Sequence, residues 1–266
     1  MDDVLSLIYR HVGLFNNAVE PTRGRYGSRI FEPVRIALLD SGFDPAILHI
    51  ENDTPRIQDI RSFIPDTDLL DMQDEIGYDA ITQAINHAVT EWNVDIITMS
   101  FGIREYHEPM KDAIVKVLSQ GILMFAAASN DGVNFGRAFP AKYPSIFCIH
   151  STDGNGNLSS FNSTADEKDV NFSLLGQSVP TPIAAGLAAS PLSFLRQEEQ
   201  GLPPGSDLLG PWLKDVHSMD AVLERMAKQR RGQGYDYITP HVLFERNLLR
   251  EHVYNKIKDI KKDMYD

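Results

Sequence analysis

Short apolar stretches alternate along the chain with segments of helical periodicity, and this alternation constrains the fold more than any other feature. The apolar stretches are residues 34–39, 94–99, 121–128 and 143–150. The helix-like segments between them are residues 75–92 and 109–119. Unbroken apolar runs are typical of strands buried on both faces, and their alternation with helices is typical of a parallel sheet. We therefore predict an α/β fold in which residues 34–39, 94–99 and 121–126 are adjacent parallel strands, covered on both faces.

The rest of the chain divides into a lead-in, a central domain and an extension. Residues 1–29 place apolar side chains at helical spacing before a helix-breaking stretch. Residues 30–200 hold the alternating elements and end in an alanine-rich helix at 182–197, which Pro191 should kink or end early. Residues 206–266 are predicted to form a small helical C-terminal extension, with amphipathic helices at 219–229 and 247–264.

The composition excludes several classes of partner and cofactor. Of the 266 residues, 42% are apolar and 23% are charged, and the net charge is −12. This balance disfavours nucleic acid and anionic membranes, because both require a basic face. The single cysteine, Cys148, lies in an apolar run and is predicted to be a small core residue. Residues 153–157 form a turn that lacks the glycine and glutamate of a calcium loop, so we predict neither a metal nor a cofactor.

The N-terminal residues indicate the expected location of the protein. The sequence begins Met1-Asp-Asp-Val, whereas a secretory signal begins with basic and then strongly apolar residues. No apolar stretch reaches the length that a membrane span requires. We therefore expect an intracellular, cytoplasmic protein. Four N-x-S/T sequences are interpreted as chance matches, and they begin at Asn52, Asn157, Asn162 and Asn171.

Two polar residues directly follow predicted strands. Asp40 ends the run 34–39, and Asn130 follows the run 121–128. The carboxyl ends of parallel strands are where α/β sheets hold functional groups. Asp40 could orient an imidazole, or it could cap the turn before Gly42. Asn130 could donate its side-chain amide to a developing oxyanion, or it could be an ordinary turn residue.

Ser178 is the candidate nucleophile. It lies in Gly176-Gln-Ser-Val-Pro-Thr-Pro-Ile-Ala-Ala-Gly186, directly before the alanine-rich helix. A serine at a helix start lies near free backbone N–H groups and the positive end of the helix dipole, which favour a developing oxyanion. Pro180 is tolerated in the first turn, where its missing N–H costs nothing. The alternative is that Ser178 is an ordinary N-cap residue.

Taken in order, these segments resemble the subtilisin-like serine peptidases, whose catalytic residues follow the order Asp, His, Ser. The resemblance is carried by segments covering about 34–190, which are Val34-Arg-Ile-Ala-Leu-Leu-Asp-Ser-Gly42, Met99-Ser-Phe-Gly102, Ala126-Ala-Ala-Ser-Asn-Asp-Gly132, Phe139-Pro-Ala-Lys-Tyr-Pro-Ser145 and the Ser178 segment. It implies a subtilisin-like parallel sheet flanked by helices. It also implies that Ser178 is the nucleophile, Asp40 the orienting carboxylate and Asn130 the oxyanion donor.

The general base of such a triad is missing from its expected place. The family supplies it from a His-Gly-Thr segment between the Asp strand and the Met-Ser-x-Gly strand, and no histidine of this chain is followed by glycine. Between Asp40 and Ser100 only His49 and His87 occur. His49 is interpreted as a loop or strand residue and His87 as a surface residue. The join at Gly176 also looks shortened relative to the family.

The resemblance implies a serine-type endopeptidase that acts on a peptide or protein substrate. Two alternatives remain open because the histidine segment is absent. The chain is either a catalytically inactive relative that binds or regulates, or an incomplete gene model of an active enzyme. A flavodoxin-like phosphate binder is disfavoured, because the chain has no glycine-rich phosphate loop.

Overall fold

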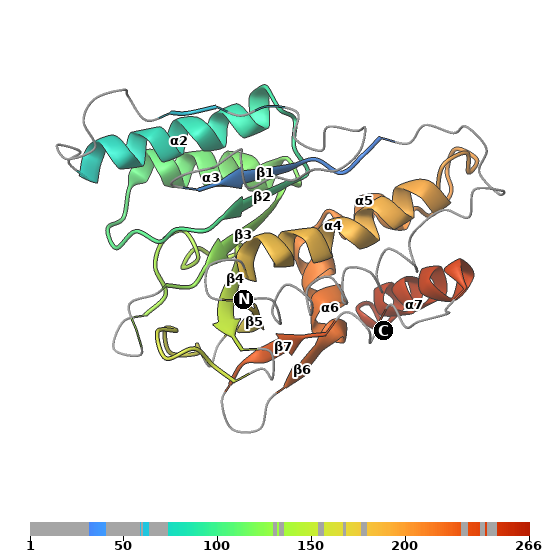
Figure 1. The fold of residues 1–266 in the computed structure, drawn as a ribbon. Coiled ribbons are helices and arrows are strands. Elements are labelled where there is room, and N and C mark those ends of the chain that lie inside the picture. Colours follow the sequence, from blue (N-terminus) through green and yellow to red (C-terminus); the bar gives the residue numbers. More distant parts are fainter. Residues whose placement is uncertain are drawn as a thin grey trace, which may run out of the picture.

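The computed structural model shows an α/β protein built on one seven-stranded sheet (Figure 1). It describes residues 32–40, 59, 61–63, 74–129, 132, 136–153, 157–166, 169–176, 180–229, 234–239, 243 and 249–266. The strands are β1 (Ile36–Leu39), β2 (Ile96–Met99), β3 (Leu123–Ala127), β4 (Phe147–Thr152), β5 (Phe172–Leu175), β6 (Ala227–Gln229) and β7 (Asp236–Ile238). The helices are α2 (Asp74–Thr90), α3 (Glu108–Ser119), α4 (Pro180–Glu198), α5 (Leu209–Leu213), α6 (Val216–Met226) and α7 (Arg250–Asp263).

The strand order in the sheet is β1-β2-β3-β4-β5-β7-β6. All neighbouring pairs from β1 to β7 are parallel, and β6 alone runs antiparallel to its neighbour. Ile36 is in register with Ile96, and Ile96 with Leu123. The prediction of three adjacent parallel strands is therefore confirmed, and so is the α/β class.

Helices cover both faces of this sheet, as Figure 1 shows. Side chains alternate along a strand, so each central strand contributes to two cores. Ile97 and Met124 lie in a core formed with α2 and α3. Ile96 and Leu123 lie in a second core formed with α4 and the C-terminal helices. We call these the α2/α3 face and the α4 face of the sheet.

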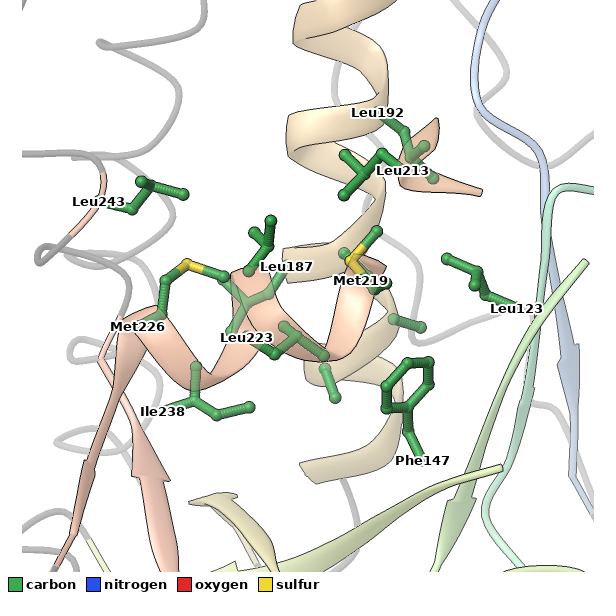
Figure 2. Close-up of a cluster of buried hydrophobic side chains, with 14 of the residues drawn as sticks. Leu123, Phe147, Leu187, Leu192, Leu213, Met219, Leu223, Met226, Ile238 and Leu243 are labelled. Carbon is green, nitrogen blue, oxygen red and sulfur yellow. The ribbon is translucent and has the colours of Figure 1, made fainter. Parts of the chain in front are cut away.

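The C-terminal residues complete the core on the α4 face. Figure 2 shows α6 packed beside α4, with its apolar side chains directed toward those of α4 and the strands. The labelled members of this core are Leu123, Phe147, Leu187, Leu192, Leu213, Met219, Leu223, Met226, Ile238 and Leu243. The predicted extension is mainly helical, but it also adds β6 and β7 to the sheet. The expected helix at 219–229 ends at Met226 because its last three residues pair as β6.

The edge strand β1 differs from the prediction. Ala37 and Leu39 are buried against the α2/α3 core, but Ile36 is 41% exposed and Leu38 is 48% exposed. The unbroken apolar run predicted burial on both faces. Among the described elements β1 has a paired neighbour only on its β2 side, and α4 does not bury these two side chains. The α4 face of β1 is therefore apolar and open.

Helix α4 crosses the α4 face as one continuous element of 19 residues. Pro191 lies inside it and does not end it early, and the alternative of a kink stays a prediction. Pro191 is itself buried in this helix, where packing against the core outweighs the missing backbone donor. The helix starts after the carboxyl end of β5. It ends at the opposite edge of the sheet, where Arg196 pairs with Asp95 just before β2.

The burial of individual side chains tests the predictions made for two asparagines and for the cysteine. Asn162 is 3% exposed and Asn171 is 4% exposed, and both side chains hydrogen-bond to backbone groups. These two buried and hydrogen-bonded side chains are consistent with the interpretation of their N-x-S/T sequences as chance matches. Cys148 is 3% exposed, which confirms it as a core residue. In the part of the chain that the structure describes, no helix is long and apolar enough to cross a membrane.

Candidate active site

Each candidate residue lies in the sequence beside an element that ends or begins at the carboxyl edge of the sheet. Asp40 directly follows β1 and is exposed at its carboxyl end. Ser129, the neighbour of Asn130, lies just beyond the carboxyl end of β3 and is buried. Helix α4 begins at Pro180, two residues after Ser178 and shortly after the carboxyl end of β5. Asn130 and Ser178 themselves lie outside the described residues, so their side-chain geometry stays a prediction.

The residue that precedes the Ser178 segment is held firmly to β4. Gly176 donates its N–H to the carbonyl of Thr152 at 3.0 Å, and its own carbonyl accepts from the hydroxyl of Ser151. Its φ of 129° belongs to the region that favours glycine. The short join between β5 and α4 therefore starts from a fixed point at the carboxyl edge.

The segment after β2 also lies at this edge. Ile103 and Phe139 exchange two backbone hydrogen bonds, at 2.8 and 2.9 Å. A Cβ on Gly102 would lie 2.7 Å from the Cβ of Ala138, so only glycine allows this approach. Sequence reasoning connected these two segments only through the family resemblance. The structure shows that they pack directly against each other.

An aromatic cluster beside this segment escaped the sequence analysis. The rings of Tyr106, Phe139 and Tyr143 lie with centroids 5.1 to 6.3 Å apart, and Tyr106 is 50% exposed. Burial raises the pKa of the Tyr143 phenol. Tyr106 belongs to no motif. Its only signal in the sequence is that it closely follows the Met99-Ser-Phe-Gly102 segment. The cluster offers an apolar surface at the carboxyl side of the sheet.

His87 is not the surface residue that the sequence predicted. It is half-buried in the last turn of α2, with its ring 5.4 Å from that of Phe63 and 5.1 Å from that of Trp92. The end of α2 leads into the amino end of β2, at the edge opposite Asp40. A four-residue strand spans about 13 Å, so His87 lies too far from the carboxyl edge to serve as the base.

His107 and His150 also lie in unsuitable places. His107 precedes α3 on the α2/α3 face, with Nε2 3.8 Å from Oδ1 of Asp79, while the Ser178 segment leads into α4 on the other face. His150 is 1% exposed within β4. Burial, with a contribution from Arg137, lowers its pKa to about 3, so the ring stays neutral. Its Nε2 lies 3.6 Å from Sγ of Cys148, whose pKa burial raises to about 12. This pair is therefore a neutral thiol beside a neutral imidazole, which is not a nucleophile with its base.

The remaining described histidines are exposed and distant from the candidate site. His217 opens α6, next to Lys214, which pairs with Asp95 at the amino edge. His252 lies in the first turn of α7, close to Arg250, which pairs with Glu198 at the end of α4. His49 lies outside the described residues. The described side chains of His, Cys, Asp and Glu contain no group of three that could hold a metal ion.

Part of the sequence matches one known protein family. The family described as "Subtilase family" matches residues 64–174. Asn130 falls inside the matched stretch, whereas Asp40 precedes it and Ser178 follows it. The match therefore covers the strands β2 to β4 and most of β5, together with α2 and α3.

Individual relatives point to the same family. Subtilisin DY of Bacillus licheniformis is 34% identical over 134 residues, which cover 44% of this chain and 48% of that protein. The major intracellular serine protease of Bacillus subtilis is 28% identical over 189 residues, which cover 64% and 57%. The chain thus spans about half the length of these relatives. Among solved structures, the prenylagaramide maturation protease PagA gives a TM-score of 0.47 at 21% identity, covering 68% of this chain and 67% of that one. Residues 64–174 are thus similar to the subtilase family, and part of the chain is similar to individual subtilisins.

Proposed function

We propose that this chain has the site of a subtilisin-like serine endopeptidase, with Ser178 as nucleophile, Asp40 as orienting carboxylate and Asn130 as oxyanion donor. The observation that supports this most is the shared carboxyl edge. Asp40 is exposed there, the strand leading to Asn130 ends there, and the helix that follows Ser178 begins there.

Each proposed role follows from local chemistry. Ser178 precedes the first turn of α4, where the positive end of the helix dipole favours negative charge on a reacting carbonyl oxygen, although Pro180 and Pro182 have no N–H to donate. Asn130 would add a side-chain N–H to the same oxyanion, and loss of such a donor in subtilisin lowers the rate on the order of 10²–10³. Asp40 would hold an imidazole in the tautomer that accepts the serine proton.

The general base is the part of this mechanism for which the described residues offer no candidate. None of the five described histidines lies beside the carboxyl edge on the α4 face. Without a base the serine hydroxyl is a weak nucleophile, so we propose that the chain as it stands cleaves peptide bonds slowly or not at all. This absence among the described histidines also supports the second candidate, a non-catalytic relative that binds peptides.

The remaining assignments are proposals of the same kind. The substrate is a peptide or protein, and the net charge of −12 argues against nucleic acid. We propose an intracellular location, which the similarity to the major intracellular serine protease of Bacillus subtilis supports. We keep the division into a lead-in at 1–29, a peptidase domain at 30–200 and an extension at 206–266.

A fluorophosphonate probe tests the proposed function, because it labels an activated serine oxygen. The chain is compared with Ser178→Ala and with Ser119→Ala, which removes an exposed hydroxyl at the end of α3. We expect labelling near the Ser178→Ala background. Added imidazole should then raise labelling of the unaltered chain and of Ser119→Ala, but not of Ser178→Ala, because it supplies the missing base.

Three outcomes separate the candidates. Rescue by imidazole supports a peptidase site that lacks only its base. Strong labelling without imidazole that disappears in Ser178→Ala shows that another group already acts as the base. Absence of labelling under both conditions rejects the peptidase site and leaves the non-catalytic relative.

A further inference from the structure

Backbone hydrogen bonds hold the described residues on either side of Asn130. Before it, Ala128 donates its N–H to the carbonyl of Ile149 on β4 at 3.0 Å. After it, Gly132 donates to the carbonyl of Phe161 at 2.9 Å. The first anchor belongs to the sheet, whereas the second depends on where Phe161 lies. The position of the 161–163 segment therefore sets where Gly132, two residues after Asn130, is held.

The 161–163 segment is fastened to β4 by the side chain of Asn162. Its Oδ1 accepts from the N–H of Ser151 at 3.1 Å, and its Nδ2 donates to the carbonyl of Ser151 at 2.7 Å. Asn162 thus satisfies both backbone groups of one strand residue, as a neighbouring strand would. This contact holds the segment at Asn162, but it does not hold the residues that follow Asn162.

Tyr235 of the C-terminal extension holds that side. Its hydroxyl donates to the carbonyl of Ser163 at 2.6 Å, and its ring lies edge-on to that of His150 with centroids 4.8 Å apart. Tyr235 is 6% exposed, so this hydrogen bond is shielded from water. Gly234 has a φ of 69°, and a Cβ on it would lie 3.2 Å from the Cβ of Ala165. The extension therefore approaches the 163–165 backbone closely.

The extension can act in this way because its own position is fixed. Asp236, next to Tyr235, donates its N–H to the carbonyl of Asn171 at 2.8 Å and is in register with Phe172 of β5. The antiparallel pair of β6 and β7 is thus part of the sheet, and Tyr235 directly precedes β7. A continuous chain of contacts runs from β7 through Tyr235, Ser163 and Phe161 to Gly132.

We propose that Tyr235 is a positioning residue for Asn130, and that the C-terminal extension thereby sets the geometry of the candidate oxyanion hole. This inference rests on the proposed function for its catalytic meaning, but the mechanical link stands on the hydrogen bonds alone. Catalytic groups lose effect when they are misplaced by about 1 Å, so one hydrogen bond that helps to hold a residue two positions from Asn130 matters.

The mechanical link is tested by hydrogen exchange at the amide of Gly132. Tyr235→Phe keeps the ring against His150 and removes only the hydroxyl. Tyr254→Phe is the matched control, because it removes another phenolic hydroxyl of the extension, which contacts Glu199 instead. We expect at least fivefold faster exchange at Gly132 in Tyr235→Phe alone. The amide of Ala128, anchored on β4, should exchange equally in all three proteins.

The catalytic meaning is tested by a double-mutant cycle on the imidazole-rescued labelling of Ser178. We expect Asn130→Ala to lower the labelling rate on the order of 10²-fold and Tyr235→Phe to lower it about tenfold. In the Asn130→Ala background the Tyr235 change should have no further effect, because its role passes through Asn130. A merely structural loss would lower the rate equally in both backgrounds.

The two measurements fail in different ways. Equal exchange at Gly132 in Tyr235→Phe and the unaltered chain overturns the link, whatever the activity. A tenfold loss that persists without Asn130 overturns the positioning role. If no protein labels even with imidazole, the proposed peptidase site has failed, and the exchange at Gly132 alone then decides whether Tyr235 helps to hold Gly132.

Discussion

The carboxylate of Asp95 accepts a hydrogen bond from the guanidinium of Arg196, and this contact joins the entrance of β2 to the end of α4. Lys214 adds an ion pair at 2.9 Å, and the backbone N–H of Arg35 donates to the same carboxylate at 3.0 Å. Arg196 also donates to the carbonyl of Pro33 at 2.9 Å. One buried acid therefore connects the entry to β1, the entry to β2, α4 and the link before α6.

Replacing this acid should destabilise the fold. Burial by itself would raise the pKa of Asp95, but hydrogen bonds from Arg196, Lys214 and Arg35 outweigh it and lower the pKa. The contribution of Asp95 to stability is therefore present above its unfolded pKa and is lost as the pH falls through the lower folded pKa. We expect Asp95→Asn to lower the free energy of unfolding at pH 7 by about 2–4 kcal/mol. Urea unfolding measures this.

The exposed Asp112 provides the control for that measurement. Asp112→Asn should change the free energy of unfolding by less than about 0.5 kcal/mol. The difference between the two variants should shrink when the measurement is repeated below pH 3. An equally large difference in acid would mean that packing, and not the charge of Asp95, supports the fold.

His150 should make the protein sensitive to acid. Burial, aided by Arg137, lowers its pKa to about 3, while in the unfolded chain the ordinary value is near 6.5. The unfolded state therefore takes up a proton first, and stability falls as the pH drops from about 6.5 towards 3. We expect His150→Gln to flatten this fall, while losing some stability at pH 8 through poorer packing. His217→Asn, which changes an exposed imidazole, should keep the steep acid dependence in urea titrations at pH 8, 6.5 and 5.

Asp220 should have the opposite dependence. Burial, with the neighbouring charge of Glu224 and smaller contributions from Asp169 and Asp236, raises its pKa to about 6, and His217 opposes this shift. Its charged form is disfavoured in the fold, so stability is lost as the pH rises from about 4 through 6. Asp220→Asn should raise the melting temperature at pH 7.5 by about 2–4 °C and leave it unchanged at pH 4. Asp259→Asn, an exposed change on α7, should have no effect at either pH.

The open apolar face of β1 gives a prediction about the gene. We expect full-length transcripts to contain a coding stretch, between the codons for residues 60 and 75, that encodes a His-Gly segment. A helix after such a segment could cover Ile36 and Leu38 on the α4 face, beside Asp40. Transcripts without that stretch would leave loss of the catalytic segment as the explanation.

Cysteine labelling tests the same idea in the protein. Leu38→Cys should react readily with a maleimide in the present chain, because Leu38 is 48% exposed and the natural Cys148 is buried. A chain that carries the additional segment should protect the new thiol. Equal reactivity in both chains would show that the segment does not pack on β1.

The fold was predictable where local sequence and tertiary structure agree. The runs that form β2 and β3 are apolar without alternation because both faces are covered, and the structure confirms their pairing. The same argument correctly predicted that β1 is a strand, but it wrongly predicted that both of its faces are buried. An apolar run does not indicate which elements pack against it. The strands β6 and β7 have three residues each, which is too short for a periodicity to be recognised.

The site was predictable only in its outline. The place of Asp40 follows from the end of a strand, and the structure bears this out. The half-burial of His87 depends on Phe63 and Trp92, and the hydrogen bond of Tyr235 joins residues 72 positions apart. No local pattern encodes such contacts. The roles of Ser178 and Asn130 remain predictions.

Helix α4 has an ion pair near one end and the candidate nucleophile before its other end. The ion pair between Arg196 and Asp95 holds α4 near its C-terminal end, and Ser178 precedes its N-terminal end. A helix of 19 residues is about 28 Å long. A tilt of about 2° around the gripped end would move the other end by about 1 Å, which is enough to disable a catalytic group. The ion pair at the amino edge of the sheet is therefore one of the contacts, together with the core packing of α4, that fix the direction in which the helix leads back to the candidate nucleophile.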